Sequence, residues 1–413
     1  MTPTPAGEPQ LAFAALHHPG FRRYFATAFT AMTADYVEHV ISYWVLFEKF
    51  ASPALGGVAV LTHWLPFLLF SVYTGALADR FDARRIIQIA YLLYLLVSVG
   101  WGVLFLTDTL EVWHAVVLLT IHGIAGVLWG PASQLLIYQI VGTQHLQSAV
   151  RLNSTSRQLA VFLGPAIGGG MMLALGPGWG MILNAFLYVP LLLWLWKAPY
   201  TTHGGGAATR GGIAQIIDTI RSLSGKRTLT AMILLSGATS LFVGNAFQAQ
   251  MPEFAHDLGT EKADFSYTAL LAANAAGGVL AGVLLETTNR LPARPGVAIG
   301  LTIAWTFAIA GFALATSYPL ALVLMVIAGF LNLAATAMAQ TLVQLNAPPA
   351  IRGRMIGLYN MAANGLRAAS GITVGVLGAV IGIHWSLALS ALALLAVTIP
   401  LMGLAMRVRA ADR

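Results

Sequence analysis

The chain has 413 residues, of which 58% are hydrophobic and only 9% are charged, and its mean hydropathy is +0.76. Soluble domains carry about 25% charged residues, so this composition excludes an ordinary soluble domain and predicts a protein that crosses a membrane many times. The net charge of +7 fits the basic inner loops of membrane proteins, and we expect no nucleic-acid partner. Cysteine is absent, which excludes disulfides and thiol chemistry. The first 20 residues lack an apolar core, so we expect no cleavable signal peptide.

Twelve apolar stretches follow one another along the chain, each long enough for the roughly 20 residues that a helical crossing needs. In order they are Phe21–Phe47, Leu55–Ala78, Ile86–Leu106, Val112–Val141, Leu146–Leu173, Trp179–Trp196, Leu229–Phe254, Tyr267–Leu285, Val297–Ala315, Tyr318–Leu345, Ile351–Ile381 and His384–Met406. The division between the ninth and the tenth rests on the Ser317-Tyr318-Pro319 break alone. The sequence therefore predicts an all-α membrane protein with twelve transmembrane helices.

A charged loop, Gly75–Arg85 (GALADRFDARR), separates the second and third predicted spans. Charges bounded so sharply by apolar runs mark a turn between two membrane helices. Part of this loop recurs 207 residues later, where Gly75, Leu77 and Asp79 correspond to Gly282, Leu284 and Glu286. Gln134 and Gln340, after the fourth and tenth spans, are 206 residues apart. Because both pairs of matching residues are separated by nearly the same number of residues, they indicate that the chain consists of two repeats of six spans each.

The segment between the sixth and seventh spans has a different composition. Glycines at 204–206 and 211–212 indicate a flexible linker, and Ile213–Leu223 is typical of an amphipathic helix lying on the membrane surface. We therefore divide the chain into a six-helix bundle at 1–198, a cytoplasmic linker at 199–228 and a second six-helix bundle at 229–413. Six spans on each side make the repeats parallel, as in a major class of transporters.

The distribution of basic residues predicts the orientation in the membrane. With the N-terminus inside, 18 of the 22 lysines and arginines fall on the inner side, and only Lys49 and Lys262 fall outside. Positive residues are enriched in cytoplasmic loops, so we expect both termini in the cytoplasm.

These features together resemble the major facilitator superfamily. The loop matches that family's signature between its second and third helices at Gly75, Leu77, Ala78, Asp79, Arg80, Arg84 and Arg85. The resemblance implies two six-helix bundles that alternate access to a central cavity. It also implies that the loop acts as a gate on the cytoplasmic side, where Asp79 pairs across the interface between the bundles. By the repeat, Glu286 takes the corresponding place in the second bundle.

Shorter motifs resemble particular branches of this superfamily. Gly164-Pro165-Ala166-Ile167-Gly168-Gly169 matches the core of the antiporter signature of drug and metabolite exporters, although Arg151 and Ala160 replace the glycines upstream. The run Trp129–Gln134 and the pair Ala34-Asp35 resemble the secretion-effector branch that includes the bacterial enterobactin exporter. Lysophospholipid flippases share parts of the same pattern. Independently of the resemblance, Gly164, Pro165, Gly168 and Gly169 lie inside a span and indicate close helix packing or bending.

Charged residues deep in the predicted spans are the candidates for coupling to protons. Asp35 lies about 18 Å beyond Arg23 along a helix, and Glu38, His39 and Ser42 continue the same face. Burial disfavours a charged carboxylate and a nearby cation favours it, so Asp35 or Glu38 is the expected proton carrier with Arg157 as its counter-charge. The alternative is a fixed Asp35–Arg157 ion pair that only joins helices. Arg157 has a third possible role, holding an anionic group of the substrate.

Other polar residues in the spans have two interpretations each. Arg367 either binds substrate or packs near the inner headgroups with a snorkelling stem. His122 either relays protons or, like His63, is simply hydrogen-bonded. Tyr43, Asn245 and Gln248 are candidate substrate contacts, and hydrogen bonding or packing between helices is the alternative for each.

The sequence thus predicts a proton-coupled exporter of a small amphipathic or partly anionic compound, drug-like or siderophore-like. The resemblance implies a monomer in the bacterial inner membrane that contacts lipids, a small molecule and protons. No P-loop, catalytic elbow or metal-ligand cluster is found, so we expect neither an enzyme nor a cofactor nor a resident metal. A lysophospholipid flippase is the first alternative, and a membrane sensor without transport is the second.

Overall fold

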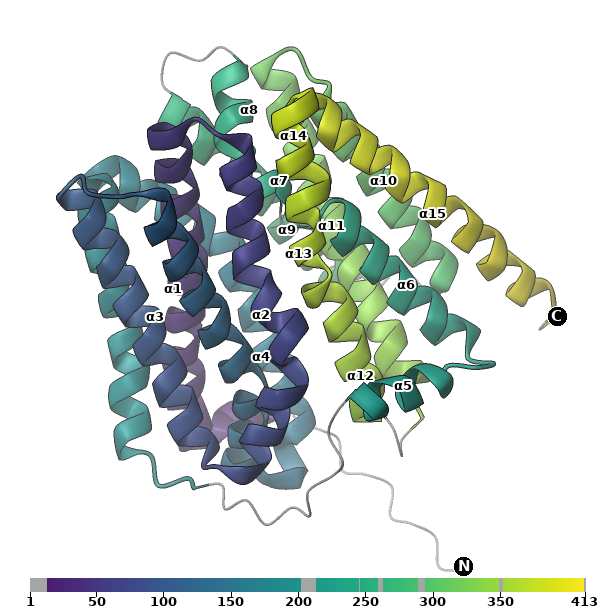
Figure 1. The fold of residues 1–413 in the computed structure, drawn as a ribbon. Helices are drawn as coiled ribbons and strands as arrows, with labels where there is room; N and C mark the ends of the chain where they lie inside the picture. Colours follow the sequence, from purple (N-terminus) through teal and green to yellow (C-terminus); the bar gives the residue numbers. More distant parts are fainter. Residues whose placement is uncertain are drawn as a thin grey trace, which may run out of the picture.

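In the computed structural model the chain forms two helical bundles that lie side by side (Figure 1). The structure describes residues 13–201, 213–244, 246–258, 263–288, 294–348 and 352–411. The first bundle holds α1–α4 and the second α6–α15, with the short linker helix α5 (Ile213–Arg221) at the edge of the second bundle (Figure 1). We call the end where α1 stops and α2 starts the α1–α2 end, and the opposite end the α2–α3 end.

The first bundle begins with three long helices whose starts are fixed by local chemistry. They are α1 (Pro19–Phe50), α2 (Pro53–Arg80) and α3 (Ala83–Leu106). The side chains of His18, Ser52 and Asp82 each accept a hydrogen bond from a backbone N–H in the first turn of the helix that follows. Such caps satisfy N–H groups that have no partner inside the helix. The predicted first three spans are confirmed, with α1 and α2 a few residues longer than expected.

The fourth, fifth and sixth spans run together in α4 (Val112–Lys197), which reverses direction twice. Gly142 (φ 65°) and Gly176 (φ 76°) have backbone conformations that glycine adopts without a Cβ clash, and they divide α4 into segments 112–141, 143–175 and 177–197. The last segment runs antiparallel to α3, because Gly178 packs on Leu106 at one end and the Ala198 carbonyl accepts from Arg84 Nη1 (2.5 Å) at the other. Both breaks lie where the sequence predicts them.

The second bundle holds the remaining spans. Its helices are α6 (Arg227–Phe242), α7 (Ala246–Ala249), α8 (Met251–Asp257), α9 (Ala263–Thr288), α10 (Pro295–Ala313), α11 (Tyr318–Asn346), α12 (Arg352–Asn360), α13 (Arg367–Ser370), α14 (Leu377–Ile381) and α15 (Ile383–Ala411). The break between α10 and α11 confirms the division at Ser317.

Two of the predicted continuous spans are interrupted. The prediction of one helix over Leu229–Phe254 is wrong, because the chain breaks after Phe242. At Gly244 (φ 47°) an added Cβ would lie 2.4 Å from Ser370 Oγ, so the close approach of α13 leaves room only for glycine there. The eleventh span is regular only in part, since π-helical turns at Met361–Gly365 and Gly371–Val376 flank α13. Such turns leave backbone groups free to bend the helix.

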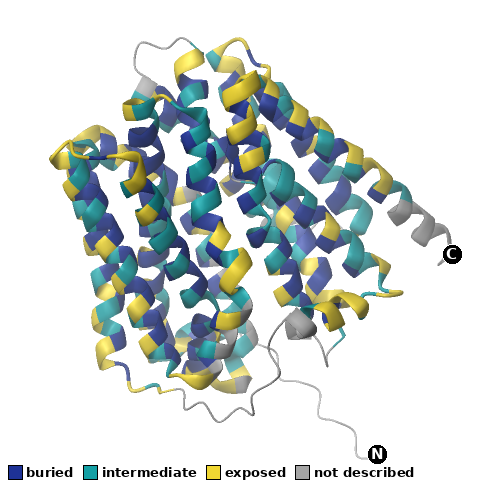
Figure 2. Ribbon diagram, in the orientation of Figure 1, coloured by how far each residue is buried: buried dark blue, intermediate teal, exposed yellow. Residues whose placement is uncertain are grey.

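Ten stretches of the described chain are long and apolar enough to cross a membrane. One of them, Leu159–Lys197, contains the reversal at Gly176 and so holds two crossings, and the 32-residue α1 adds another. The count is therefore the predicted twelve. Exposed residues line the outer faces of the helices (Figure 2), and large apolar residues are among them, such as Trp196 at 76%. Exposed apolar surface of this extent fits contact with lipid rather than water.

Among the described residues, the two bundles share one apolar core, which lies at the α1–α2 end. The largest buried cluster draws residues from both bundles there, whereas two further clusters, which contain Ala78 and Met338 respectively, each belong to one bundle. Because the shared core lies at one end and the separate cores lie at the other, the two bundles are closed on each other at the α1–α2 end.

Glycines allow this close approach. A Cβ added at Gly57 of α2 would lie 2.3 Å from the carbonyl oxygen of Gly371 and 2.9 Å from the Cα of Gly375. A Cβ added at Gly169 of α4 would lie 2.2 Å from the methyl carbon of Thr268 on α9. Backbone touches backbone at Gly57, and only a bare backbone fits at Gly169, so the α1–α2 end is tightly sealed.

Hydrogen bonds and ring stacking join the bundles at the same end. Tyr267 donates its hydroxyl proton to the Val40 carbonyl (3.0 Å) and stacks on Trp44 (5.4 Å between ring centroids). Towards the α2–α3 end α2 is open to solvent or lipid, because Leu69 is 60% exposed and Tyr73 is 68% exposed. The bundles are therefore joined at the α1–α2 end, and α2 is exposed to solvent or lipid towards the α2–α3 end.

Candidate functional site

The centre of the first bundle holds two carboxylates joined by one imidazole. Asp35 and Glu38 are three residues apart on α1 and so share a face. His122, on segment 112–141 of α4, lies between them, with Nε2 2.6 Å from Asp35 Oδ1 and Nδ1 2.6 Å from Glu38 Oε1. Gly123, the next residue, lets α4 approach α2 so closely that an added Cβ would lie 2.2 Å from the His63 carbonyl oxygen. This approach of α2 and α4 sets the depth at which the His122 ring meets α1.

The two contacts of His122 require an extra proton. A neutral imidazole has one N–H donor and one bare nitrogen, and an ionised carboxylate only accepts. Two nitrogen–oxygen contacts of 2.6 Å therefore need one proton more than neutral His122 and two ionised carboxylates supply. Without that proton a bare nitrogen and a carboxylate oxygen would face each other at this distance, which is repulsive. The Asp35–His122–Glu38 triad therefore accommodates one proton more than neutral His122 and two ionised carboxylates carry.

The two ends of this triad differ in access to solvent. The Asp35 side chain is 27% exposed, while Glu38 is 2% exposed and His122 is buried. Asp35 is therefore the more exposed end of the triad, and Glu38 is the buried end.

A buried hydrogen-bond chain holds Glu38 in place. The Ser98 hydroxyl donates to Glu38 Oε2 (2.8 Å), and Asn184 Nδ2 donates to Ser98 Oγ (2.9 Å). Neither Ser98 nor Asn184 was among the site residues predicted from the sequence. The available signal was a polar side chain in each of two apolar spans, α3 and segment 177–197 of α4.

Two more histidines complete the cluster. His39 bonds through Nδ1 to its own helix, at the Asp35 carbonyl (2.7 Å), and its ring lies 4.6 Å from that of His63 and 4.9 Å from that of His122. The three imidazoles bring one nitrogen each within 4.8 Å of one another, a spacing at which they could hold a metal ion. Both nitrogens of His122 already contact carboxylates, so a metal would have to displace Asp35 or Glu38 from this ring.

Arg157 does not contact Asp35 as expected. Within the described part of the chain Asp35 pairs with His122 and more distantly with His39 (3.7 Å). The guanidinium of Arg157 lies instead over the ring of Trp129 (5.3 Å), so the predicted Asp35–Arg157 ion pair is wrong in this conformation.

Arg367 reaches across to the first bundle. Its guanidinium lies over the Trp64 ring of α2 at 4.8 Å, and its Nε donates to the Ala363 carbonyl (3.0 Å). The predicted alternative, a side chain snorkelling at the inner headgroups, does not describe this position. The Trp64 ring in turn lies edge-on to His63 (4.6 Å).

The other predicted substrate contacts have different positions. Tyr43 is buried against His39 (5.6 Å between rings), and its hydroxyl has no partner among the described residues, so it is not open to a ligand in this conformation. Gln248 is half-buried in α7. Asn245 lies outside the described residues.

The predicted gate residues lie where α2 ends and α3 begins. Arg80 is exposed, Arg84 pairs with Asp82 (3.4 Å), and Arg85 donates to Gln88 (2.9 Å). Gly75 and Asp79 lie in α2 and Glu286 lies in α9, but the pairing of Asp79 and of Glu286 lies outside what the structure describes. The pairing of Asp79 across the bundles therefore stays a prediction.

The glycine-rich motif packs against two partners. A Cβ at Gly164 would lie 2.3 Å from the Cβ of Tyr36, and one at Gly168 would lie 3.1 Å from the Cα of Val37, so both glycines face α1. Gly169 faces α9 of the other bundle, and Pro165 is buried inside α4.

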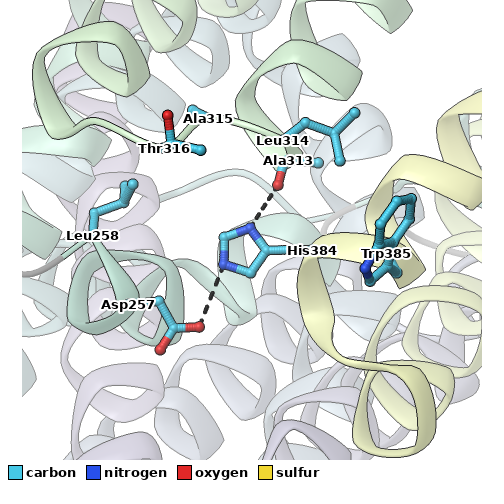
Figure 3. A pocket seen from close by; sticks show the side chains of 8 residues that line it. All are labelled: Asp257, Leu258, Ala313, Leu314, Ala315, Thr316, His384 and Trp385. Atoms are coloured by element: carbon cyan, nitrogen blue, oxygen red, sulfur yellow. Dashed lines mark hydrogen bonds and ion pairs between the residues drawn. The ribbon is translucent and has the colours of Figure 1, made fainter.

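A separate hollow of about 400 Å³ lies in the second bundle, on the α1–α2 side. His384 spans it, with Nδ1 2.6 Å from the Ala313 carbonyl oxygen and Nε2 3.3 Å from Asp257 Oδ2 (Figure 3). These contacts tie α15 to α10 and α8, which is a structural role far from the triad.

Two helical bundles joined at one end, with buried ionisable groups in the centre of the first bundle, fit a multi-spanning membrane transporter. The chain belongs to the transmembrane secretion effector family of the major facilitator superfamily, whose profile matches residues 10–413. The protein is therefore a transporter of small molecules and not an enzyme.

Relatives of known sequence are transporters as well. The chain is 24% identical to the multidrug efflux pump Tap of Mycolicibacterium fortuitum over 371 residues, 86% of this chain and 88% of Tap. It is 26% identical over 152 residues to the uncharacterized transporter YfiS of Bacillus subtilis and 23% identical over 147 residues to the staphyloferrin A transporter of Staphylococcus aureus. These two matches cover 36% and 35% of this chain and only 35% and 37% of those proteins.

Solved structures share the fold. A bacterial homologue of the human lysosomal transporter Spinster, in an inward-facing and unoccupied conformation, superposes with a TM-score of 0.71 at 16% identity and covers 98% of this chain and 99% of its own. The nucleoside transporter NupG gives a TM-score of 0.69 at 12% identity and covers 93% of this chain and 98% of its own.

Proposed function

We propose that this protein is a proton-coupled exporter that moves a small amphipathic or partly anionic compound, drug-like or siderophore-like, by alternating access. The names of its relatives support this choice, since Tap is a multidrug efflux pump and the staphyloferrin A transporter is named for a siderophore. The two bundles act as the moving parts of the cycle, in the division 1–198, 199–228 and 229–413.

The observation that carries the proposal is the pair of 2.6 Å contacts that His122 makes with Asp35 and Glu38, which together call for one extra proton. When the triad loses it, a bare nitrogen and a carboxylate oxygen face each other at 2.6 Å and must separate. Asp35 and Glu38 lie on α1, and His122 lies on α4, so their separation changes the packing of α1 on α4. That change links the protonation state to the arrangement of the helices.

The cycle follows from this link. A proton enters at Asp35 from the outer face, is shared through His122 with Glu38, and leaves to the inner face after the bundles rock. Arg157 lies on segment 143–175 with its guanidinium over Trp129 and makes no ion pair with Asp35 in the described part of the chain. In this cycle Arg157 is a remote counter-charge rather than the direct partner of Asp35.

The proposed orientation follows from the basic loops. Both termini and the α2–α3 end lie in the cytoplasm, and the protein is a monomer among lipids of the bacterial inner membrane. The observed conformation, closed at the α1–α2 end, is then open to the cytoplasm and ready to receive a substrate for export. The proposed gate lies at this open end and consists of Gly75, Asp79, Arg80, Arg84, Arg85 and Glu286. Substrate contacts are drawn from Arg157, Arg367, Tyr43, Asn245 and Gln248.

The test uses the purified full chain in proteoliposomes with an imposed pH gradient. Ethidium and salicylate, a cationic and an anionic aromatic probe, are offered, and their accumulation is followed. Wild type should accumulate at least one of them in a gradient-dependent way, and Asp35→Asn should abolish this accumulation while the melting temperature stays near that of wild type.

Asp218→Asn is the matched control, because Asp218 is exposed on the linker helix α5. It should transport as wild type does. Undiminished gradient-driven flux in Asp35→Asn would sink the coupling role of Asp35. Flux of lysophospholipid in wild type without any gradient would instead favour the flippase.

A further inference from the structure

Three histidines from three different helices surround one point in the first bundle. His39 is on α1, His63 is on α2 and His122 is on segment 112–141 of α4. The ring centroid of His39 lies 4.6 Å from that of His63 and 4.9 Å from that of His122, and the His63 and His122 centroids are 4.9 Å apart. One ring nitrogen of each lies within 4.8 Å of the other two. Because the three residues lie on separate spans, no ligand spacing in the sequence reveals them.

His63 is the member of this group that has no hydrogen bond to explain its burial. Its side chain is 3% exposed, and its buried Nδ1 has no hydrogen-bond partner among the described residues. Leaving a buried nitrogen unpaired is costly, and a bound ion is one of the partners that removes this cost. The close approach of α2 and α4 at Gly123 places this residue next to His122.

The other two rings are oriented in the way that metal-binding histidines are. His39 Nδ1 lies 2.7 Å from the Asp35 carbonyl oxygen, which only accepts, so this nitrogen carries the proton and Nε2 of the neutral ring has the free lone pair. Glu38 does the same for Nδ1 of His122, and the Ser98 hydroxyl holds Glu38 in turn. Histidine ligands commonly donate their second N–H to a backbone carbonyl or a carboxylate, which fixes the ring and its tautomer.

Asp35 is placed to supply a fourth ligand. Its Oδ1 lies 2.6 Å from His122 Nε2, so an ion that enters between these two atoms separates them and takes both as ligands. The side chains of Asp35 and His39 are 27% and 12% exposed, which gives the ion a path to the cluster. Asp35 and Glu38 carry two negative charges when ionised and three neutral imidazoles carry none, so a divalent cation balances the charge of the cluster. Uncompensated charge is costly inside a membrane.

We propose that His39, His63, His122 and Asp35 bind one divalent transition-metal ion of the zinc type. Three imidazole nitrogens and one carboxylate oxygen are a ligand set that Zn²⁺ takes in tetrahedral geometry. Bonds of about 2.05 Å would place the nitrogens about 3.4 Å apart, so they have to approach one another from their present spacing of up to 4.8 Å. Rotation of the rings about the soft χ2 torsion supplies this movement. The inference goes beyond the proposed transport function, and the metal and the extra proton of the triad exclude each other on the His122 ring.

The experiment uses Co²⁺ as the probe, because tetrahedral Co²⁺ absorbs visible light far more strongly than the hydrated ion. The purified full chain, free of any histidine tag, is titrated with Co²⁺, and the visible bands are followed. The chain has no cysteine, so thiolate bands cannot obscure the spectrum. Wild type should develop tetrahedral bands that saturate at one equivalent, and Zn²⁺, which has a filled d shell, should bleach them.

Variants of the ligands test which residues hold the ion. His39→Ala and His63→Ala should each weaken Co²⁺ binding by about 100-fold or more, since removal of an outer partner alone costs about 10–100-fold. Ser98→Ala, which removes the support of Glu38, should lose about tenfold. His256→Ala, at an exposed histidine of α8, is the matched control and should bind as wild type does.

A stability measurement covers the case in which an alanine variant does not fold. His63→Gln keeps a polar side chain of similar length, and its melting temperature without metal reports whether the fold is intact. Zn²⁺ should raise the melting temperature of wild type, because it binds the folded chain, and should raise that of His63→Gln much less. Absence of tetrahedral bands in wild type would overturn the proposal. Equal, unsaturated binding in wild type and both His63 variants would overturn it as well, since that pattern means an adventitious ion only. Both readouts measure binding, so their outcome does not depend on whether the protein transports.

Discussion

Adding one methyl group at Gly57 should push the two bundles apart at the α1–α2 end. Gly57 of α2 faces the backbone of Gly371 and Gly375, and the new Cβ would lie 2.3 Å from a carbonyl oxygen. That is about 1 Å closer than non-bonded atoms normally approach. Both neighbours are backbone, so no side chain can rotate away, and α2 or the second bundle must move.

The size of the effect follows from the cost of overpacking. An extra methyl in a tightly packed contact costs about 1–3 kcal/mol. The methyl group costs nothing in a conformation that is open at the α1–α2 end, because Gly57 and Gly371 are apart there. An equilibrium biased by about 1–3 kcal/mol changes about 5–150-fold, so Gly57→Ala should populate the conformation that is open at the α1–α2 end and closed at the α2–α3 end.

The absence of cysteine makes the measurement direct. A single Tyr73→Cys reporter sits on the exposed part of α2, where maleimide labels it in the observed conformation. Labelling should slow in the Gly57→Ala background, and a Gln250→Cys reporter, buried beside the Pro53 carbonyl at the sealed end, should label faster.

Gly130→Ala is the matched control, because nothing lies within 4 Å of a Cβ added there. Both reporters should label in this background as they do in wild type. Labelling rates and a melting temperature in Gly57→Ala that equal those of Gly130→Ala would refute the reasoning that backbone contact at Gly57 holds this end shut.

Three further changes probe other contacts. Ser98→Ala removes a donor to Glu38 and leaves a buried carboxylate oxygen unpaired, so it should lower stability by about 1–3 kcal/mol, whereas Ser42→Ala, which loses only a bond within its own helix, should lower the melting temperature less. Tyr267→Phe removes one hydrogen bond across the bundles and should shift reporter labelling in the same direction as Gly57→Ala, by about fivefold for about 1 kcal/mol; unchanged labelling would mean that this bond forms in both conformations. Burial and a neighbouring aspartate raise the pKa of Glu253, in α8 outside the spans, from 4.5 to about 7. Because the pKa of this carboxyl is higher in the folded protein than in the unfolded chain, it adds stability at pH below 4.5 and loses that contribution as pH rises to about 7. The melting temperature of wild type should therefore fall between these pH values, and that of Glu253→Gln should fall less. Parallel pH profiles of the two proteins would contradict this.

The number of spans and their order could be predicted from the sequence because each span is long and apolar. The breaks at Gly142 and Gly176 fell in the predicted loops, since only loops tolerate the backbone conformation that these glycines adopt. The interruption after Phe242 could not be predicted, because its cause is Ser370, which lies more than 120 residues away along the chain. A contact between residues so far apart cannot be predicted from the sequence around Phe242.

Part of the candidate site could be predicted, because two of its residues lie close together in the sequence. Helical spacing places Asp35 and Glu38 on one face of α1, and the cost of charge in a membrane marks them as functional. The sequence could not show which cation meets them. Arg157 has the full charge and was the expected partner, whereas His122 is the residue that the packing of α4 against α2 brings within 2.6 Å of both carboxylates.

The sequence by itself determined a twelve-span transporter, because hydropathy, loop charge and the repeat are properties that short stretches of the chain carry on their own. Only the tertiary structure decided that the α1–α2 end is sealed, since that depends on Gly57 meeting Gly371 across two bundles. Only the tertiary structure, too, placed His122 of α4 between Asp35 and Glu38 of α1. Contacts between helices that are distant in the sequence depend on how the helices pack in three dimensions, and a short stretch of sequence does not specify that packing.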